Sequence, residues 1–200
     1  IRFCDWSSDV CSSDLAIVMF ALGASIVRPS IVGAHDHNYK VEPVKRSIVQ
    51  AKITAVTLVR EDGVKIDLAK ELQDPRPTYL NFIFTSCTTV CPVMSQIFSA
   101  LQDKLAKERD KVRMMSVSID PEHDTPARLT LYAQAFDAVP SQWHFYTGTH
   151  EASLAVQRAF GILGLDKMNH PVATFFRAAP GQPWVRIDGF ASADVLERRF

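Results

Sequence analysis

The sequence predicts an α/β fold in which a central mixed β-sheet is covered by helices on both faces. Stretches of β-prone and of helix-periodic sequence alternate along the chain, which is typical of a sheet with helical connections. Two stretches, residues 78–85 and 112–119, are almost continuously apolar, as strands buried on both faces are. We expect functional residues at the carboxyl edge of this sheet, the usual place for sites in such folds.

The first strands are predicted to form a β-hairpin. Apolar residues alternate over residues 53–59 and again over residues 64–68, with Asp62 and Gly63 between them. An Asp-Gly pair between two alternating runs is a strong signal for a tight hairpin turn.

Two helices are predicted in the middle of the chain. Residues 92–110 carry a buried stripe at three- and four-residue spacing, made of Val93, Ile97, Ala100, Leu101 and Leu105. Met94 is expected in the core. Residues 125–136 begin with Thr125 as N-cap and Pro126 at the first helical position.

The last third of the chain continues the alternation of strands and helices. The patterns predict a strand at 143–146, a helix at 150–160, strands at 172–177 and 184–187, and a helix at 192–199. Pro180 and Gly181 between the last two strands indicate a second hairpin.

The N-terminal part is interpreted as lying outside the folded domain, which is assigned to residues 51–200. Residues 1–14 are read as a non-native segment, because they contain a near-repeat of Ser-Ser-Asp and show no periodicity. Residues 15–34 begin with an apolar stretch that matches the core of a signal peptide, with a short membrane anchor as the alternative. Residues 35–50 are assigned as a linker. Either reading of 15–34 predicts export to the periplasm or to the periplasmic face of the inner membrane.

The composition narrows the classes of function. The chain has 22 Lys and Arg against 22 Asp and Glu, so no long-range field attracts nucleic acid. Hydrophobic residues make up 47% and charged residues 22%, which excludes a disordered chain. None of the eight glycines forms a G-x-G-x-x-G loop, so nucleotide binding has no support. Four cysteines are too few for a disulfide scaffold but enough for one redox or metal site.

The motif that carries chemistry is the segment 85–92, between a predicted strand and a predicted helix. Cys87 and Cys91 are four positions apart, so a helical turn places both sulfurs on one face. That arrangement permits either a disulfide or two thiolates on one metal ion. A helix N-terminus lowers a thiol pKa, and Pro92 suits the first turn because it lacks an N–H. We therefore interpret both cysteines as functional thiols.

Two segments taken together resemble the SCO (SenC/PrrC-type) family. Residues 82–92 contain C-x-x-x-C-P, residues 118–126 contain D-P-E-x-D-T-P, and the likeness runs from about residue 53 to residue 200. Members of this family have a thioredoxin-like fold, bind copper and help to assemble the CuA centre of cytochrome c oxidase. The resemblance implies a thioredoxin-like fold with an N-terminal β-hairpin, and copper as Cu(I) or Cu(II). As partner it implies the oxidase subunit that carries CuA, or another copper protein.

The resemblance also implies the metal ligands, because the family's site uses the two cysteines and one distal histidine. Six histidines are candidates: His35, His37, His123, His144, His150 and His170. The family's histidine precedes a β-strand, which only His170 matches, and the implied ligands are Cys87, Cys91 and His170. The chain departs from the family in reading His170-Pro171 where His-Ser or His-Thr is usual. Two thiolates and one imidazole suit Cu(I), and an added outside ligand suits Cu(II).

Two carboxylates follow the second buried strand. Asp120 ends that strand, so we expect it next to the cysteines, where it orients a ligand or tunes a thiol. Asp124, with Thr125 and Pro126, is interpreted as part of a helix cap.

Three functions remain open at this point. The leading hypothesis is a copper metallochaperone, a binding and transfer protein. A coupled role, reduction of the target's oxidised cysteines before metal delivery, is compatible with it because Cys87 and Cys91 can cycle between dithiol and disulfide. The alternative is an enzyme, either a thiol–disulfide oxidoreductase or a peroxiredoxin-like peroxidase, with one nucleophilic and one resolving cysteine. His170 discriminates between these classes, since copper chemistry needs it and disulfide exchange does not. A redox or copper sensor would share every one of these residues.

Overall fold

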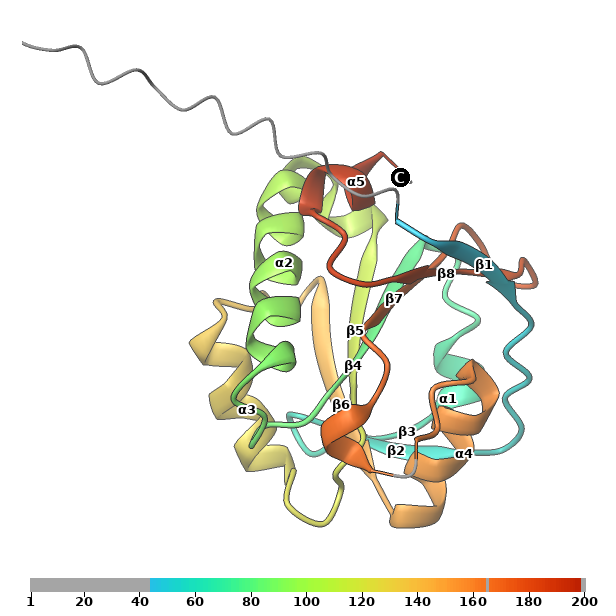
Figure 1. Cartoon of the computed structure of the whole chain (residues 1–200), viewed down its shortest axis with the longest axis vertical. Coiled ribbons are helices and arrows are strands. Elements are labelled where there is room, and N and C mark those ends of the chain that lie inside the picture. The colour runs from blue at the N-terminus through green and yellow to red at the C-terminus, as the bar shows by residue number, and fades with distance from the viewer. Residues whose placement is uncertain (1–43, 165, 199–200) are drawn as a thin grey trace, which may run out of the picture. The chain divides into compact units, whose positions relative to one another are not determined.

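The computed structural model describes residues 44–164 and 166–198 (Figure 1). The interpretations of residues 1–34 and of His35 and His37 therefore fall outside the described part of the chain. No helix within the described ranges is both long and apolar enough to cross a bilayer.

The described residues form one eight-stranded mixed sheet with the order β1-β8-β7-β4-β5-β6-β2-β3. The strands are β1 Arg46–Val49, β2 Thr57–Arg60, β3 Lys65–Asp67, β4 Thr78–Ile83, β5 Arg113–Ser118, β6 Trp143–Gly148, β7 Ala173–Arg177 and β8 Trp184–Asp188. Strands β4, β5 and β6 run parallel, and the other pairings are antiparallel. All residues of β4 and β5 are buried. These findings confirm the mixed sheet, the two buried strands and the N-terminal hairpin β2–β3.

Helices cover both faces of this sheet, as Figure 1 shows. They are α1 Leu68–Glu71, α2 Val90–Lys104, α3 Pro126–Ala135, α4 His150–Phe160 and α5 Ala193–Glu197. Helices α2 and α3 lie on one face because both connect neighbouring parallel strands, and such crossovers have the same hand. Helix α4 lies on the opposite face. Short 3₁₀ helices span Ala106–Lys111 and Lys167–Asn169.

Aromatic side chains fill a core layer on each side of the sheet. On the α2 side, the rings of Phe98 and Trp143 have centroids 5.7 Å apart. On the α4 side, Phe160 packs against Phe82 at 5.6 Å and against Phe175 at 5.0 Å. This aromatic packing fixes the positions of α2 and α4 relative to the central strands.

Local signals place several helix ends where they were predicted. Thr125 caps α3 by accepting the N–H of Arg128, with Pro126 in the first turn. Helix α4 covers residues 150–160 as expected, since Thr149 caps its start and Gly161 ends it with a φ of 65°.

Two expectations are corrected by the structure. The assigned linker 35–50 contains β1, which pairs antiparallel with the edge of β8. Val93, expected in the core, is 46% exposed, because a different stripe of α2 faces the sheet. That stripe consists of Cys91, Met94, Ser95, Phe98, Ser99, Leu101 and Gln102, so Met94 is a core residue as expected.

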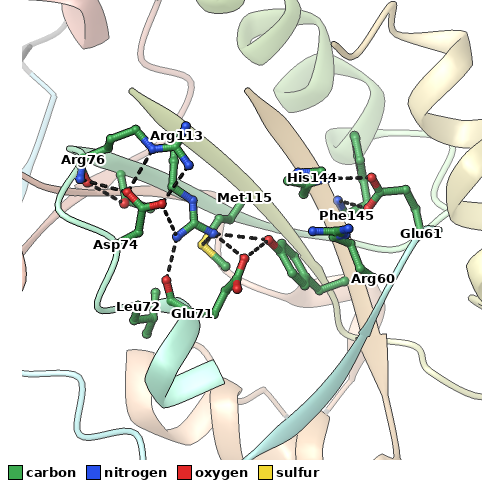
Figure 2. A network of polar contacts seen from close by, with 12 residues as sticks. Arg60, Glu61, Glu71, Leu72, Asp74, Arg76, Arg113, Met115, His144 and Phe145 are labelled. Carbon is green, nitrogen blue, oxygen red and sulfur yellow. Dashed lines mark hydrogen bonds and ion pairs between the residues drawn. The ribbon is translucent and has the colours of Figure 1, made fainter. Parts of the chain in front are cut away.

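A network of charged groups ties the amino end of the parallel strands to the segment before β4 (Figure 2). Arg113, the first residue of β5, donates to the Oε1 of Glu71 at 2.6 Å and to its backbone carbonyl at 2.6 Å. The hydroxyl of Tyr146 donates to the same carboxylate at 3.0 Å. The Arg113 side chain is 5% exposed. Because its charge is satisfied from several sides, this end of the sheet is firmly fixed.

Candidate metal centre

The two cysteines lie at the junction between β4 and α2, at the carboxyl edge of the sheet. The N–H of Cys87 donates to the Phe84 carbonyl at 3.1 Å, which closes a tight turn after the strand. Thr89 occupies the N-cap position of α2 but makes no side-chain cap. Instead, the Sγ of Cys87 accepts the N–H of Cys91 at 3.4 Å. The sulfur thus takes up one of the N–H groups that a helix start leaves without a partner.

The two thiols differ in how readily they ionise. Burial opposes ionisation of Cys87, but hydrogen bonds from the backbone N–H groups of Cys91 and Thr89 outweigh it and lower the pKa of Cys87. For Cys91, burial is the main cause that raises the pKa well above the ordinary value, and the neighbouring Cys87 adds to the rise. Cys91 is fully buried, whereas Cys87 is 5% exposed. Both are free thiols. Cys87 is therefore the group that becomes a thiolate first.

His170 directs one ring nitrogen at Cys91. Its Nε2 lies 3.6 Å from the Cys91 Sγ, and its Nδ1 lies 3.2 Å from the Pro171 carbonyl. A carbonyl oxygen only accepts, so Nδ1 carries the proton and the Nε2 lone pair faces the sulfur. Burial lowers the pKa of His170, which keeps the ring neutral at pH 7. A histidine that binds a metal commonly donates its other N–H to a backbone carbonyl in this way.

The separation of the Cys91 and His170 donors suits one metal ion. Bond lengths of about 2.3 Å to sulfur and about 2.0 Å to nitrogen place the two donors of a trigonal ion about 3.7 Å apart. Still, no three His, Cys, Asp or Glu side chains in the described residues are already gathered as a metal site. The Sγ of Cys87 lies 3.7 Å from the Thr89 hydroxyl and also interacts with the Cys91 side chain. Two of the predicted ligands are thus brought together, while the third lies beside them in a hydrogen-bonded position.

Space beside His170 permits a further ligand. A cavity of about 200 Å³ lies between α4 and the segment that carries His170. Its lining includes Ile119, His150, Leu154, Gln157, Lys167 and His170.

Asp120 lies near this centre but contacts neither cysteine through any described hydrogen bond. Its Oδ1 lies 3.0 Å from the Nδ1 of His123, and its Oδ2 lies 2.7 Å from the Nζ of Lys167. Burial opposes ionisation, but Lys167 and His123 outweigh it and lower the pKa of Asp120. The expected tuning of a thiol therefore has no direct contact behind it. The carboxylate reaches instead the segment that precedes His170.

Asp124 does not cap α3, contrary to the interpretation from its sequence context. It is fully buried and accepts hydrogen bonds from the Thr85 N–H, the Thr85 hydroxyl and the Ser118 hydroxyl. These contacts join the ends of β4 and β5 directly before the cysteine turn. The sequence holds a signal for this role, since hydroxyl residues end both buried strands and require an acceptor when buried.

The remaining described histidines are engaged elsewhere. His123 pairs with Asp120, and the Nδ1 of His144 lies 2.7 Å from the Glu61 carboxylate (Figure 2). His150 has a side chain that is 60% exposed. Among the four histidines in the described part of the chain, His170 is the one in contact with a cysteine.

Comparison with known families gives a match over most of the domain. The model of the SCO1/SenC family matches residues 49–194. A curated relative, the SCO1 protein homolog of Bacillus subtilis (strain 168), is 33% identical over 117 residues. That alignment covers 58% of this chain and 53% of the relative, so it spans about half of the relative's length.

Solved structures show the same fold. A SCO1/SenC family lipoprotein from Bacillus anthracis str. Ames has a TM-score of 0.66 at 23% identity, over 76% of this chain and 95% of the other. BsSco, described with a disulfide switch and as a member of the Sco family of cytochrome c oxidase assembly proteins, has a TM-score of 0.65 at 24% identity, over 76% and 93%. Copper-bound ScoI of Bradyrhizobium japonicum has a TM-score of 0.60 at 24% identity, over 72% and 94%. These likenesses confirm the thioredoxin-like Sco fold.

Proposed function

The chain belongs to the SCO1/SenC family, and we propose that it binds copper through Cys87, Cys91 and His170 in the service of cytochrome c oxidase assembly. The observation that carries this proposal is the 3.6 Å contact between the Cys91 Sγ and the His170 Nε2, with the other ring nitrogen bound to a carbonyl. The copper-bound ScoI structure, which has the same fold, supports the choice of metal. The description of BsSco supports the role in oxidase assembly.

The donor set explains a preference for copper. Thiolates are soft ligands that select Cu(I), and an imidazole adds a nitrogen that Cu(II) favours. His170 is already neutral and oriented, whereas both thiols must lose their protons, Cys87 more easily than Cys91. The Cys87 sulfur already interacts with the Cys91 side chain, so the two thiols are neighbours before any metal binds.

We extend the proposal from copper binding to copper delivery. The recipient is the oxidase subunit that carries CuA, or another copper protein, and transfer takes place in the periplasm or at the periplasmic face of the inner membrane. Residues 15–34 act there as a removed signal peptide or as a membrane anchor. A related structure from the family is described as a lipoprotein, which supports an exported location.

Copper titration of the reduced protein tests the site. We expect one copper per chain, loss of Cu(I) binding in Cys87→Ala and in Cys91→Ala, and loss of the thiolate-to-Cu(II) absorption band in His170→Ala. His150→Ala is a matched control, since this exposed histidine lies near the site without contacting a cysteine, and it should retain copper. Unchanged copper content in either cysteine variant would refute the assignment.

A second candidate function, thiol–disulfide exchange, is favoured by the opposite pKa shifts of the two thiols. The Cys87 thiolate would attack a target disulfide and release one target thiolate. Cys91 would then attack the mixed disulfide, leaving a Cys87–Cys91 disulfide and a reduced target. His170→Ala separates the two functions, because it should abolish the Cu(II) band while the disulfide still forms and is reduced reversibly. Catalytic reduction of disulfides or peroxide by a wild-type protein without that band would favour the enzyme.

A further inference from the structure

Lys167 joins the segment that carries His170 to the end of β5. Its Nζ lies 2.7 Å from the Oδ2 of Asp120. The Asp120 side chain is 7% exposed, and the Lys167 side chain is 40% exposed. The carboxylate thus belongs to the buried end of the sheet, and the lysine reaches in from the surface.

The turn between Lys167 and His170 is short and internally bonded. Lys167 begins the 3₁₀ helix Lys167–Asn169, and its carbonyl accepts the N–H of His170 at 3.4 Å. Asp166 caps this helix, since its side chain accepts the N–H of Met168 at 2.9 Å and the side-chain amide of Asn169 at 3.1 Å. A constraint on Lys167 is therefore passed on to the histidine three residues later.

Lys167 and His170 share an aromatic neighbour, Phe84. The Nζ of Lys167 is 5.7 Å from the centre of the Phe84 ring, and that ring meets the His170 ring edge-on at 5.9 Å. Phe84 is buried, and its carbonyl accepts the N–H of Cys87. The lysine, the ring and the histidine are thus neighbours above the cysteine turn.

The described part of the stretch between Ile162 and His170 has few other contacts that fix its position. Between Ile162 and His170, which are both buried, every residue that the structure describes is exposed. Exposed residues contribute little burial to offset the entropy lost when a loop is ordered. The Asp120–Lys167 ion pair is the charged contact by which this stretch reaches a buried group, and the Phe84 ring lies beside the same lysine.

We propose that the Asp120–Lys167 ion pair is a latch that holds His170 in position for copper, with Lys167 as a positioning residue. This inference rests on the proposed copper site. Cys87 and Cys91 are held by the strand-to-helix junction, whereas the buried third ligand directly follows an exposed stretch that needs its own anchor. The latch supplies that anchor and favours the three-ligand site over a two-thiolate site.

Substitution of the lysine tests the latch in the copper-loaded protein. Lys167→Met should lower Cu(II) affinity about 10-fold, in the range measured for groups that orient metal ligands, and weaken the nitrogen coupling in the Cu(II) spectrum. Lys167→Arg keeps the charge and should restore both. Asp120→Asn should resemble Lys167→Met, and the double variant should lose no more than either alone.

Lys104→Met is the matched control for loss of a surface ion pair. Its Nζ lies 2.6 Å from Asp194, and its side chain is 38% exposed, close to the value for Lys167. It should leave copper affinity and spectrum unchanged. If Lys167→Met binds Cu(II) like the wild type, or no more weakly than Lys104→Met, the latch is refuted.

A measurement without copper separates failure of the latch from failure of the copper site. Hydrogen exchange at the amides of residues 166–170 should be faster in copper-free Lys167→Met, but not in Lys104→Met. If His170→Ala leaves the copper spectrum intact, the proposed ligand is wrong, and copper-free exchange alone decides the latch. Exchange rates equal to those of the wild type would then overturn it.

Discussion

The two ends of the parallel strands are held in very different ways. At the amino end, the buried Arg113 binds both the side chain and the carbonyl of Glu71, and Tyr146 reaches the same carboxylate (Figure 2). At the carboxyl end, the proposed ligands come from a strand-to-helix junction and from the end of an exposed stretch, which Lys167 joins to the sheet through Asp120 and Phe84. The fixed end stabilises the fold, which leaves the other end free to carry ligands on separate parts of the chain.

The largest expected effect is at the fixed end. Glu71→Leu leaves the buried Arg113 guanidinium without its nearest carboxylate, and should lower the free energy of unfolding by about 3 kcal/mol. Urea denaturation measures this change, and copper stoichiometry should be unaffected. The double variant Glu71→Leu with Arg113→Met should recover much of the loss. A single variant as stable as the wild type would show that this network does not fix the sheet.

A smaller effect is expected from Asp124, a fully buried and firmly bonded carboxylate at the carboxyl end. Asp124→Asn replaces one of the two carboxylate oxygens by an NH2 group, which cannot accept the hydrogen bond from Thr85 or that from Ser118, and should cost about 2 kcal/mol of unfolding free energy. Because Thr85 directly precedes the cysteine turn, exchange of the Cys87 amide should also become faster. If the free energy of unfolding falls but exchange of the Cys87 amide does not change, Asp124 stabilises the sheet and does not fix the cysteine turn. The two ends of the strands would then differ even more in how they hold their neighbouring segments.

The difference between the thiols gives a third test. The pKa of Cys87 is lowered, so alkylation of the reduced protein near neutral pH should modify Cys87 first, with a rate that rises tenfold per pH unit below that pKa. Cys91 should react only after unfolding, because it is buried and its pKa is raised. Peptide mass mapping after brief treatment identifies the modified residue. Equal labelling of both cysteines would contradict the geometry of the junction.

How far the sequence predicts each part depends on whether the signal is local. Helix α4 has its predicted bounds, and the local cap residues Thr149 and Gly161 set its two ends. Strand β1 was missed because it is a four-residue edge strand with three exposed positions, and so has no alternating pattern. The stripe of α2 was misplaced at Val93 because the inward face includes the polar residues Ser95, Ser99 and Gln102, which a search for apolar positions passes over.

In the candidate site, too, residues with a local sequence signal were predicted and those with distant partners were not. Cys87 and Cys91 stand out through their spacing, whereas His170 is singled out by the resemblance to a family whose histidine precedes a strand. Asp124 was misread because its partners Thr85 and Ser118 are on other strands, which a local capping argument does not consider. Lys167 gave no signal at all, since its partner Asp120 is 47 positions away and an isolated lysine is usually a solvated surface group.

The smallest expected effect is a pH dependence that comes from His170. Burial lowers the pKa of this ring in the folded protein below the ordinary value of 6.5, so the unfolded chain binds more protons just below that pH. Stability should therefore be constant above about pH 6.5 and fall on acidification until the lowered pKa is reached, with a slope of at most about 1.4 kcal/mol per pH unit for one proton. Thermal unfolding of the copper-free protein between pH 7.5 and pH 5 measures this slope, and His170→Gln should flatten it while His150→Ala should not. An equal slope in His170→Gln would show that the ring is protonated as easily in the folded protein as in the unfolded chain. The Nε2 would then not be the desolvated lone pair that faces Cys91, and the loop end of the molecule would be more open than the ion pair to Asp120 implies.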